Sequence, residues 1–77
     1  MRTVVIRRPE DLGLALAEAR RTAGVTQAWL ADETGVERTY LAKLEAGIST
    51  VLLTRVVRLL RRLDARLVVE LPDESSG

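Results

Sequence analysis

The sequence contains neither cysteine nor histidine, and this absence excludes several kinds of functional site. Without cysteine the chain has no disulfide and no thiolate ligand for a metal. Without histidine it lacks the commonest metal ligand and general base. It has no glycine-rich phosphate loop, and its serines have no base nearby in the sequence. We therefore expect no catalytic residues, no metal, no cofactor and no small-molecule substrate.

Aromatic residues and long apolar runs are also scarce. Trp29 and Tyr40 are the only aromatic residues, so the core must consist of leucine, valine, isoleucine and alanine. The apolar run Val4–Ile6 near the start is too short for a secretory signal, and no run approaches the ~20 residues of a membrane span. We expect a cytoplasmic protein that does not associate with a membrane.

Net charge gives little indication of function, because 12 basic and 11 acidic residues leave only +1. A nucleic-acid interface must therefore depend on where the charges lie. The chain has 77 residues, and a domain of this size buries only ~60% of its unfolded surface. With no disulfide or metal, association of subunits is the expected source of additional stability.

Hydrophobic periodicity and capping residues divide the chain into helices and strands. Thr3–Ile6 is short and β-branched, which favours a strand. The next helix begins at Pro9 and ends before Gly24, since proline is favoured in a first helical turn and glycine after a last one. The same signals predict a helix over residues 27–34 between Thr26 and Gly35, a helix over residues 37–46 that follows Val36 and is ended by Gly47, a helix from Leu52 or Leu53 to Leu63, and a strand over residues 66–71 ending at Pro72.

Residues 1–72 are predicted to form one domain, and residues 73–77 a polar, disordered tail; residues 48–50 are predicted to form a loop.

The helix that ends at Leu63 is unusually apolar. Its predicted core stripe consists of Leu53, Val56, Val57, Leu60 and Leu63. Leu52 and Leu59 widen that stripe beyond what a single core contact needs, which indicates a second buried surface.

Residues 26–47 carry the clearest functional pattern. Two short helices separated by Gly35 match the geometry of a helix-turn-helix. Small Ala31 permits a close approach of the second helix, and Val36, Leu41 and Leu44 anchor that helix. A helix held in this way can enter the major groove of DNA, with its first residues nearest the base edges. An ordinary helical hairpin would not need the ordered combination Thr-Gln, Leu-Ala, Gly-Val and Leu-x-x-Leu-Glu-x-Gly.

This combination closely resembles the Cro/C1-type (XRE) helix-turn-helix family. The resemblance covers residues 10–63 and implies a mainly helical, λ-repressor-like bundle of four to five helices that binds double-stranded DNA. It implies a phosphate contact from Gln27 at the start of the first motif helix. The predicted DNA-binding residues are Gln27, Glu37, Arg38, Thr39, Tyr40 and Lys43.

Each of these residues has more than one interpretation. Arg38 and Thr39 are the candidates for reading bases, because arginine pairs with guanine and a threonine methyl contacts the thymine methyl. Glu37 stands where the family often has serine; it either accepts from cytosine or caps the helix, and we favour the cap. Tyr40 either reaches a phosphate or packs at the helix edge, and Lys43 contacts the DNA backbone or solvent. Trp29 is expected to pack at least partly in the core.

The flanking segments narrow the resemblance further. Pro9–Gly13, the helix-turn-helix, a Leu/Val-rich helix and the strand 66–71 resemble the layout of HipB-type antitoxins. That resemblance implies a homodimeric repressor that binds a palindromic operator, represses its own operon and neutralises a HipA-type serine/threonine kinase toxin. It also implies that the C-terminal strand pairs with its two-fold mate. The predicted dimerisation residues are Leu52, Leu59, Arg66, Leu67, Val68, Val69, Glu70 and Leu71.

Three alternatives remain open at this point. The strand 66–71 can pair with residues 3–6 of the same chain instead of with its own copy, because either arrangement satisfies its unpaired backbone groups. The protein can be a stand-alone phage-type repressor without a toxin. It can also be a protein-interaction module that no longer binds DNA, which Glu37 and the low net charge slightly favour.

Overall fold

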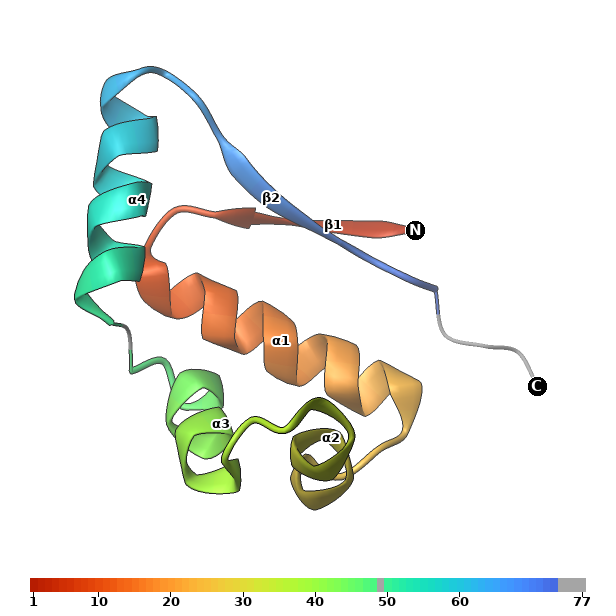
Figure 1. The fold of residues 1–77 in the computed structure, drawn as a ribbon. Coiled ribbons are helices and arrows are strands. Elements are labelled where there is room, and N and C mark those ends of the chain that lie inside the picture. Colours follow the sequence, from red (N-terminus) through yellow and green to blue (C-terminus); the bar gives the residue numbers. More distant parts are fainter. Residues whose placement is uncertain (49, 74–77) are drawn as a thin grey trace.

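The structure, a computed structural model, describes residues 1–48 and 50–73 and combines four helices with two strands in that part of the chain. Figure 1 shows α1 in the middle, with the strands on one side and α2 and α3 on the other. This arrangement confirms the predicted mainly helical bundle. The elements are β1 (Arg2–Ile6), α1 (Pro9–Ala23), α2 (Gln27–Thr34), α3 (Arg38–Glu45), α4 (Val51–Arg62) and β2 (Leu67–Leu71).

The helix ends are determined locally, which explains why most of their bounds were predictable. The hydroxyl of Thr26 accepts the N–H of Trp29 at 3.0 Å, as expected for a residue that caps a helix. Thr50 caps α4 in the same way by accepting the N–H of Leu53 at 3.2 Å. Gly24 and Gly35 adopt the left-handed conformation, with φ of 73° and 75°, and end α1 and α2.

Some predicted bounds need correction. The third helix covers Arg38–Glu45 rather than residues 37–46, because Glu37 has extended backbone angles and so precedes the first helical residue. The fourth begins at Val51, directly after its cap. Ser49 of the predicted 48–50 loop and residues 74–77 of the predicted tail lie outside the described residues. Within the described part, no helix has the length and apolar character that crossing a membrane requires.

The two strands form an antiparallel pair within the chain, with Val4 opposite Val69 and Ile6 opposite Leu67. The sequence analysis placed β2 against a second copy, but its partner in the structure is β1, which is the alternative left open above. The predicted alternation along β2 is confirmed, since Leu71 is buried and Val69 is half-buried, whereas Val68 and Glu70 are exposed. The inward face of this sheet supplies much of the small core.

That core lies where β1, α1 and α4 meet. Ile6, Ala15 and Val57 are at most 5% exposed and form its centre. The apolar stripe predicted for α4 is therefore divided: Val57 is buried and Leu53 and Leu60 are half-buried. Contrary to the prediction, Val56 and Leu63 do not reach the core. Leu52, Val56 and Leu59 of α4 and Leu63 directly after it are 70%, 38%, 64% and 75% exposed and are called the apolar stripe from here on. Val51, the first residue of α4, is also exposed, at 67%.

The contact between α1 and α3 depends on Gly13, which lies in the interior of α1 and is buried. A Cβ atom at this position would overlap the backbone carbonyl oxygen of Leu44 in α3. A backbone atom cannot move aside as a flexible side chain can. Only glycine therefore lets α3 lie this close to α1, although glycine weakens the helix itself.

We predict that Gly13→Ala destabilises the protein, despite the better helix propensity of alanine. The overlap with Leu44 must push α3 away from α1, and overpacking of this kind costs about 1–3 kcal/mol. Urea unfolding followed by circular dichroism measures the change. Leu14→Ala is the control, because Leu14 is the next residue of α1 and is 53% exposed. An equal or greater stability of Gly13→Ala would contradict the close contact.

Candidate nucleic-acid interface

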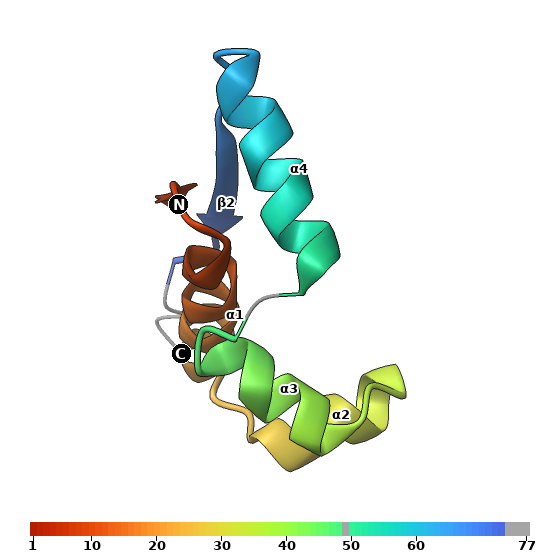
Figure 2. The same ribbon diagram turned by 90° about the vertical axis from the view of Figure 1, so that its left-hand side faces the viewer.

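The two helices of the motif are held at a fixed angle by a short turn. The turn between α2 and α3 contains Gly35 in the left-handed conformation. Ala31 of α2 is 8% exposed and Leu41 of α3 is 3% exposed, so both helices present an apolar side to the bundle, as predicted. Val36, also predicted as an anchor, instead lies in the turn and is 38% exposed. Figure 2 shows α2 and α3 together at the end of the molecule farthest from the last turns of α4. The opposite side of α3 is left free.

The free side of α3 carries the residues predicted to read DNA. Arg38, Thr39 and Lys43 are exposed, and Tyr40 is 47% exposed, which favours a role at the surface over packing alone. None of their side chains takes part in an ion pair within the described residues. Their charged and polar groups are therefore available to phosphates and base edges.

Glu37 has the position of a helix cap but not the hydrogen bond of one. Its backbone is extended, and its side chain makes no capping hydrogen bond. The interpretation we favoured above, a capping side chain, is wrong in this respect. The carboxylate stands beside Arg38 and Asp32 around a shallow hollow of about 360 Å³ between α2 and α3. It is therefore free to accept a hydrogen bond from a base, or to repel a phosphate.

Gln27 lies at the first position of α2, where the N–H groups have no carbonyl partner within the helix and favour an anion. Its side-chain amide donates one hydrogen bond to a carboxylate oxygen of Glu45 at 3.0 Å. An amide group has a second N–H. The predicted phosphate contact thus stays compatible with the structure, and the bond to Glu45 fixes the orientation of the amide.

Trp29 does not lie in the core, contrary to the expectation above. Its exposed fraction is 51%, and the buried residue of α2 is Ala31. Helical spacing alone did not distinguish the exposed side from the buried one, since α2 has only eight residues and apolar residues on both sides. An exposed tryptophan in the first helix of the motif adds an amphipathic contact group to this surface.

A buried ion pair connects α3 to the other two helices of this end. Arg20 of α1 donates two hydrogen bonds to the carboxylate of Glu45, from Nε at 2.8 Å and from Nη2 at 2.9 Å. It also donates to the carbonyl of Val25 at 2.9 Å. The side chains of Arg20 and Glu45 are 15% and 5% exposed. With Gln27, this cluster joins the end of α1, the start of α2 and the end of α3.

The hydrogen bonds from Arg20 lower the pKa of the Glu45 carboxyl below its ordinary value; burial opposes this shift, and the bond from Gln27 adds to it. The pKa of Arg20 is raised, chiefly by its hydrogen bonds to Glu45. Sequence reasoning missed this pair: it treated Arg20 as a cation at a helix end and Glu45 as part of a motif. Helical spacing within one element cannot reveal a bond between residues 25 positions apart.

We predict that Glu45→Gln lowers the free energy of unfolding by about 1–3 kcal/mol at pH 7, because the charge-assisted hydrogen bonds from Arg20 are weakened. A lowered folded-state pKa stabilises the protein above the ordinary carboxyl pKa. That stability is lost as the pH falls through the lower folded-state value. The difference between wild type and variant should therefore shrink below about pH 4, the range in which unperturbed glutamate titrates.

Urea unfolding at a series of pH values tests this expectation, with Glu33→Gln as the control. Glu33 lies on α2, is exposed and has no ion pair within the described residues. Some acid sensitivity will remain in the Glu45 variant. Asp11 accepts the backbone N–H groups of Arg7 and Arg8 at 3.0 Å, and the bond from Arg8 is the main cause of its lowered pKa. A pH-independent difference would contradict a role for the Glu45 charge.

Comparison with known proteins gives one match. A family model described as a helix-turn-helix domain matches residues 11–72, which includes all four helices except the first two residues of α1, as well as β2. Searches of the curated proteins and of the solved structures found no match. The matched range is most of the chain and contains the motif whose geometry is described above. The chain therefore belongs to the helix-turn-helix domain family of the Cro/C1 (XRE) type, whose members bind DNA and regulate transcription.

Proposed function

We propose that this protein is a homodimeric transcriptional repressor that reads a palindromic operator with α3. The observation that carries this proposal is the free side of α3, where Arg38, Thr39 and Lys43 are exposed without an ion pair in the described residues. The Arg20–Glu45 pair holds that helix against α1. Arg38 and Thr39 would contact base edges, and Gln27, Tyr40 and Lys43 would contact the DNA backbone.

Two exposed features support the homodimer. The apolar stripe of α4 extends over Leu52, Val56, Leu59 and Leu63, which recur at the spacing of one helix side. β2 has β1 on one edge and no strand on the other within the described residues. Pairing that second edge with its two-fold mate would bring exposed Arg66 near Glu70 of the mate, an attractive pair. A two-fold dimer places two recognition helices about 34 Å apart, one turn of DNA.

The layout further favours an antitoxin that represses its own operon and neutralises a HipA-type kinase toxin. This part of the proposal depends on the resemblance of the segments that flank the motif, namely the start of α1, the apolar α4 and the strand β2. It predicts a kinase-like gene beside the gene for this protein. Without such a neighbour, a stand-alone phage-type repressor becomes the better description of the same DNA-binding dimer.

A second candidate, a protein-interaction module without DNA binding, is favoured by the charges around α3. Within the motif, the exposed acidic residues are Asp32, Glu33 and Glu37. The exposed basic residues there are Arg38 and Lys43. Carboxylates at this surface oppose binding to phosphates. The strength and salt dependence of DNA binding distinguish the two candidates, since a DNA-binding protein loses affinity steeply as salt increases.

We predict that Arg38→Ala weakens binding to the DNA immediately upstream of the gene by about 1–3 kcal/mol, the contribution of one base-reading side chain. Binding to a random-sequence duplex should change little. Lys43→Ala should weaken both equally and reduce the salt dependence, because it removes a backbone contact. Fluorescence anisotropy titrations at several salt concentrations measure all three proteins. If the intact protein shows no preference for the upstream DNA, the repressor proposal fails and the interaction module leads.

We predict that Leu59→Lys converts the dimer into a monomer, because it places a charge in the middle of the apolar stripe. Sedimentation equilibrium reports the mass. Leu14→Lys is the matched control: Leu14 is 53% exposed, but lies on α1 rather than on the stripe, so this variant should remain dimeric. A monomeric wild-type protein, or a dimeric Leu59→Lys, would exclude α4 as the dimer surface.

A further inference from the structure

Half of the 12 basic residues lie on α4 or close to it, outside the motif. All of them are exposed, and α4 itself contains no acidic residue. They come from α4, from the turn that follows it and from the turn after β1. This arginine cluster consists of Arg7, Arg55, Arg58, Arg61, Arg62 and Arg66.

Within the described part of the chain, no carboxylate forms an ion pair with the cluster. Arg2, Arg8, Arg20 and Arg21 all pair with carboxylates, whereas no arginine of the cluster has an ion pair within residues 1–48 and 50–73. Asp64 is the acidic residue between α4 and β2, and it also has no ion pair there. Unpaired like charges on one surface repel one another, so this surface favours a bound anion.

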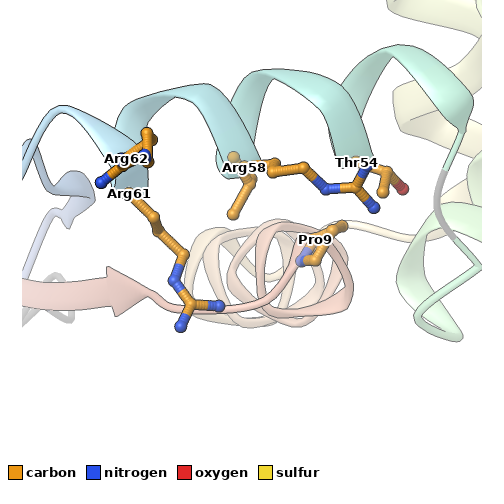
Figure 3. Close-up of a pocket in the computed structure, with 6 residues that line it drawn as sticks. Pro9, Thr54, Arg58, Arg61 and Arg62 are labelled. Carbon is orange, nitrogen blue, oxygen red and sulfur yellow. The ribbon is translucent and has the colours of Figure 1, made fainter.

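Five of the six arginines, all except Arg55, line two adjoining grooves that share Arg61. One groove, of about 490 Å³, lies between α4 and the start of α1 and is lined by Pro9, Val57 and Arg58 among others. The second, of about 440 Å³, lies between β1 and the turn into β2 and includes Arg7 and Arg66. Figure 3 shows Arg61 reaching from α4 past the start of α1, while Arg58 extends along α4 toward Thr54. The guanidinium groups are thus spread over a recessed surface rather than a single point.

The place of the cluster in the fold indicates what it binds. Figures 1 and 2 show the last turns of α4 and the pair α2–α3 at opposite ends of the molecule, which is 40 Å long. A duplex seated on α3 therefore lies at the other end. Guanidinium groups bind carboxylates through paired hydrogen bonds, as Arg20 does with Glu45. We propose that the arginine cluster is a docking site for an acidic segment of a protein partner, separate from the DNA-binding surface.

A pair of triple variants tests this proposal against the effect of net charge. Arg7→Gln/Arg58→Gln/Arg61→Gln removes three charges from the cluster and leaves Arg66, which the dimer proposal pairs with Glu70 of the mate, unchanged. Arg21→Gln/Arg38→Gln/Lys43→Gln removes three charges from the rest of the chain. The probes are a fluorescent 16-residue peptide of alternating glutamate and alanine and a random-sequence duplex, each titrated at low and at physiological salt. All the changed residues are exposed, and the ion pair that the changes remove is the one between Arg21 and Glu18 at the surface. Circular dichroism checks the fold of both variants.

The expected result is that the cluster variant binds the peptide at least tenfold more weakly and keeps its affinity for the duplex. The second variant should keep its affinity for the peptide, whatever happens to its DNA binding. Three outcomes would overturn the proposal: no binding of the peptide to the intact protein, equal loss of peptide binding in both variants, or loss of duplex binding in the cluster variant. Loss of duplex binding in the cluster variant would mean that these arginines contact the DNA backbone instead. Failure of the peptide arm leaves the repressor proposal intact, because that proposal is tested on α3.

Discussion

The position of the recognition helix depends on its contact with α1, and that contact has two parts. Gly13 removes the side chain that would collide with the carbonyl of Leu44, so the backbones of α1 and α3 can approach. Arg20, farther along α1, then binds Glu45, the residue that follows Leu44 in α3. The first part determines the distance between the helices and the second their register. Because Gln27 also bonds to Glu45, the start of α2 is held by the same carboxylate, and the motif behaves as one unit.

Elsewhere, the described part of the fold leaves apolar side chains exposed and strand edges unpaired. α4 buries Val57 but leaves four apolar residues exposed, and the two-stranded sheet has an unpaired edge on each strand within the described residues. A 77-residue chain has too little interior to bury all of its apolar side chains. The proposed dimer would cover the stripe of α4 and the edge of β2 together. It would thereby relate the stability of the domain to the spacing of its two recognition helices.

Charge is distributed along the molecule rather than concentrated on the motif. The net charge of +1 conceals an arginine cluster around the end of α4 and a motif surface on which acidic and basic residues are nearly balanced. Specific readout by Arg38 and Thr39 would then matter more for DNA binding than general attraction to phosphates. The same distribution leaves the other end of the molecule suited to an acidic partner, so that one small domain can present two separate surfaces.

The sequence by itself determined the elements of this protein. Thr26, Gly24, Gly35 and Pro9 act on backbone groups within a few residues, and such local effects are visible in the order of the amino acids. The spacing of the motif likewise predicted which residues of α3 would be exposed. Only the tertiary structure decided the pairing of β2 with β1, the division of the apolar residues of α4, the exposure of Trp29 and the bond between Arg20 and Glu45. Each of these joins or separates residues distant in the chain, and helical or strand periodicity gives the face of an element but not what lies against it.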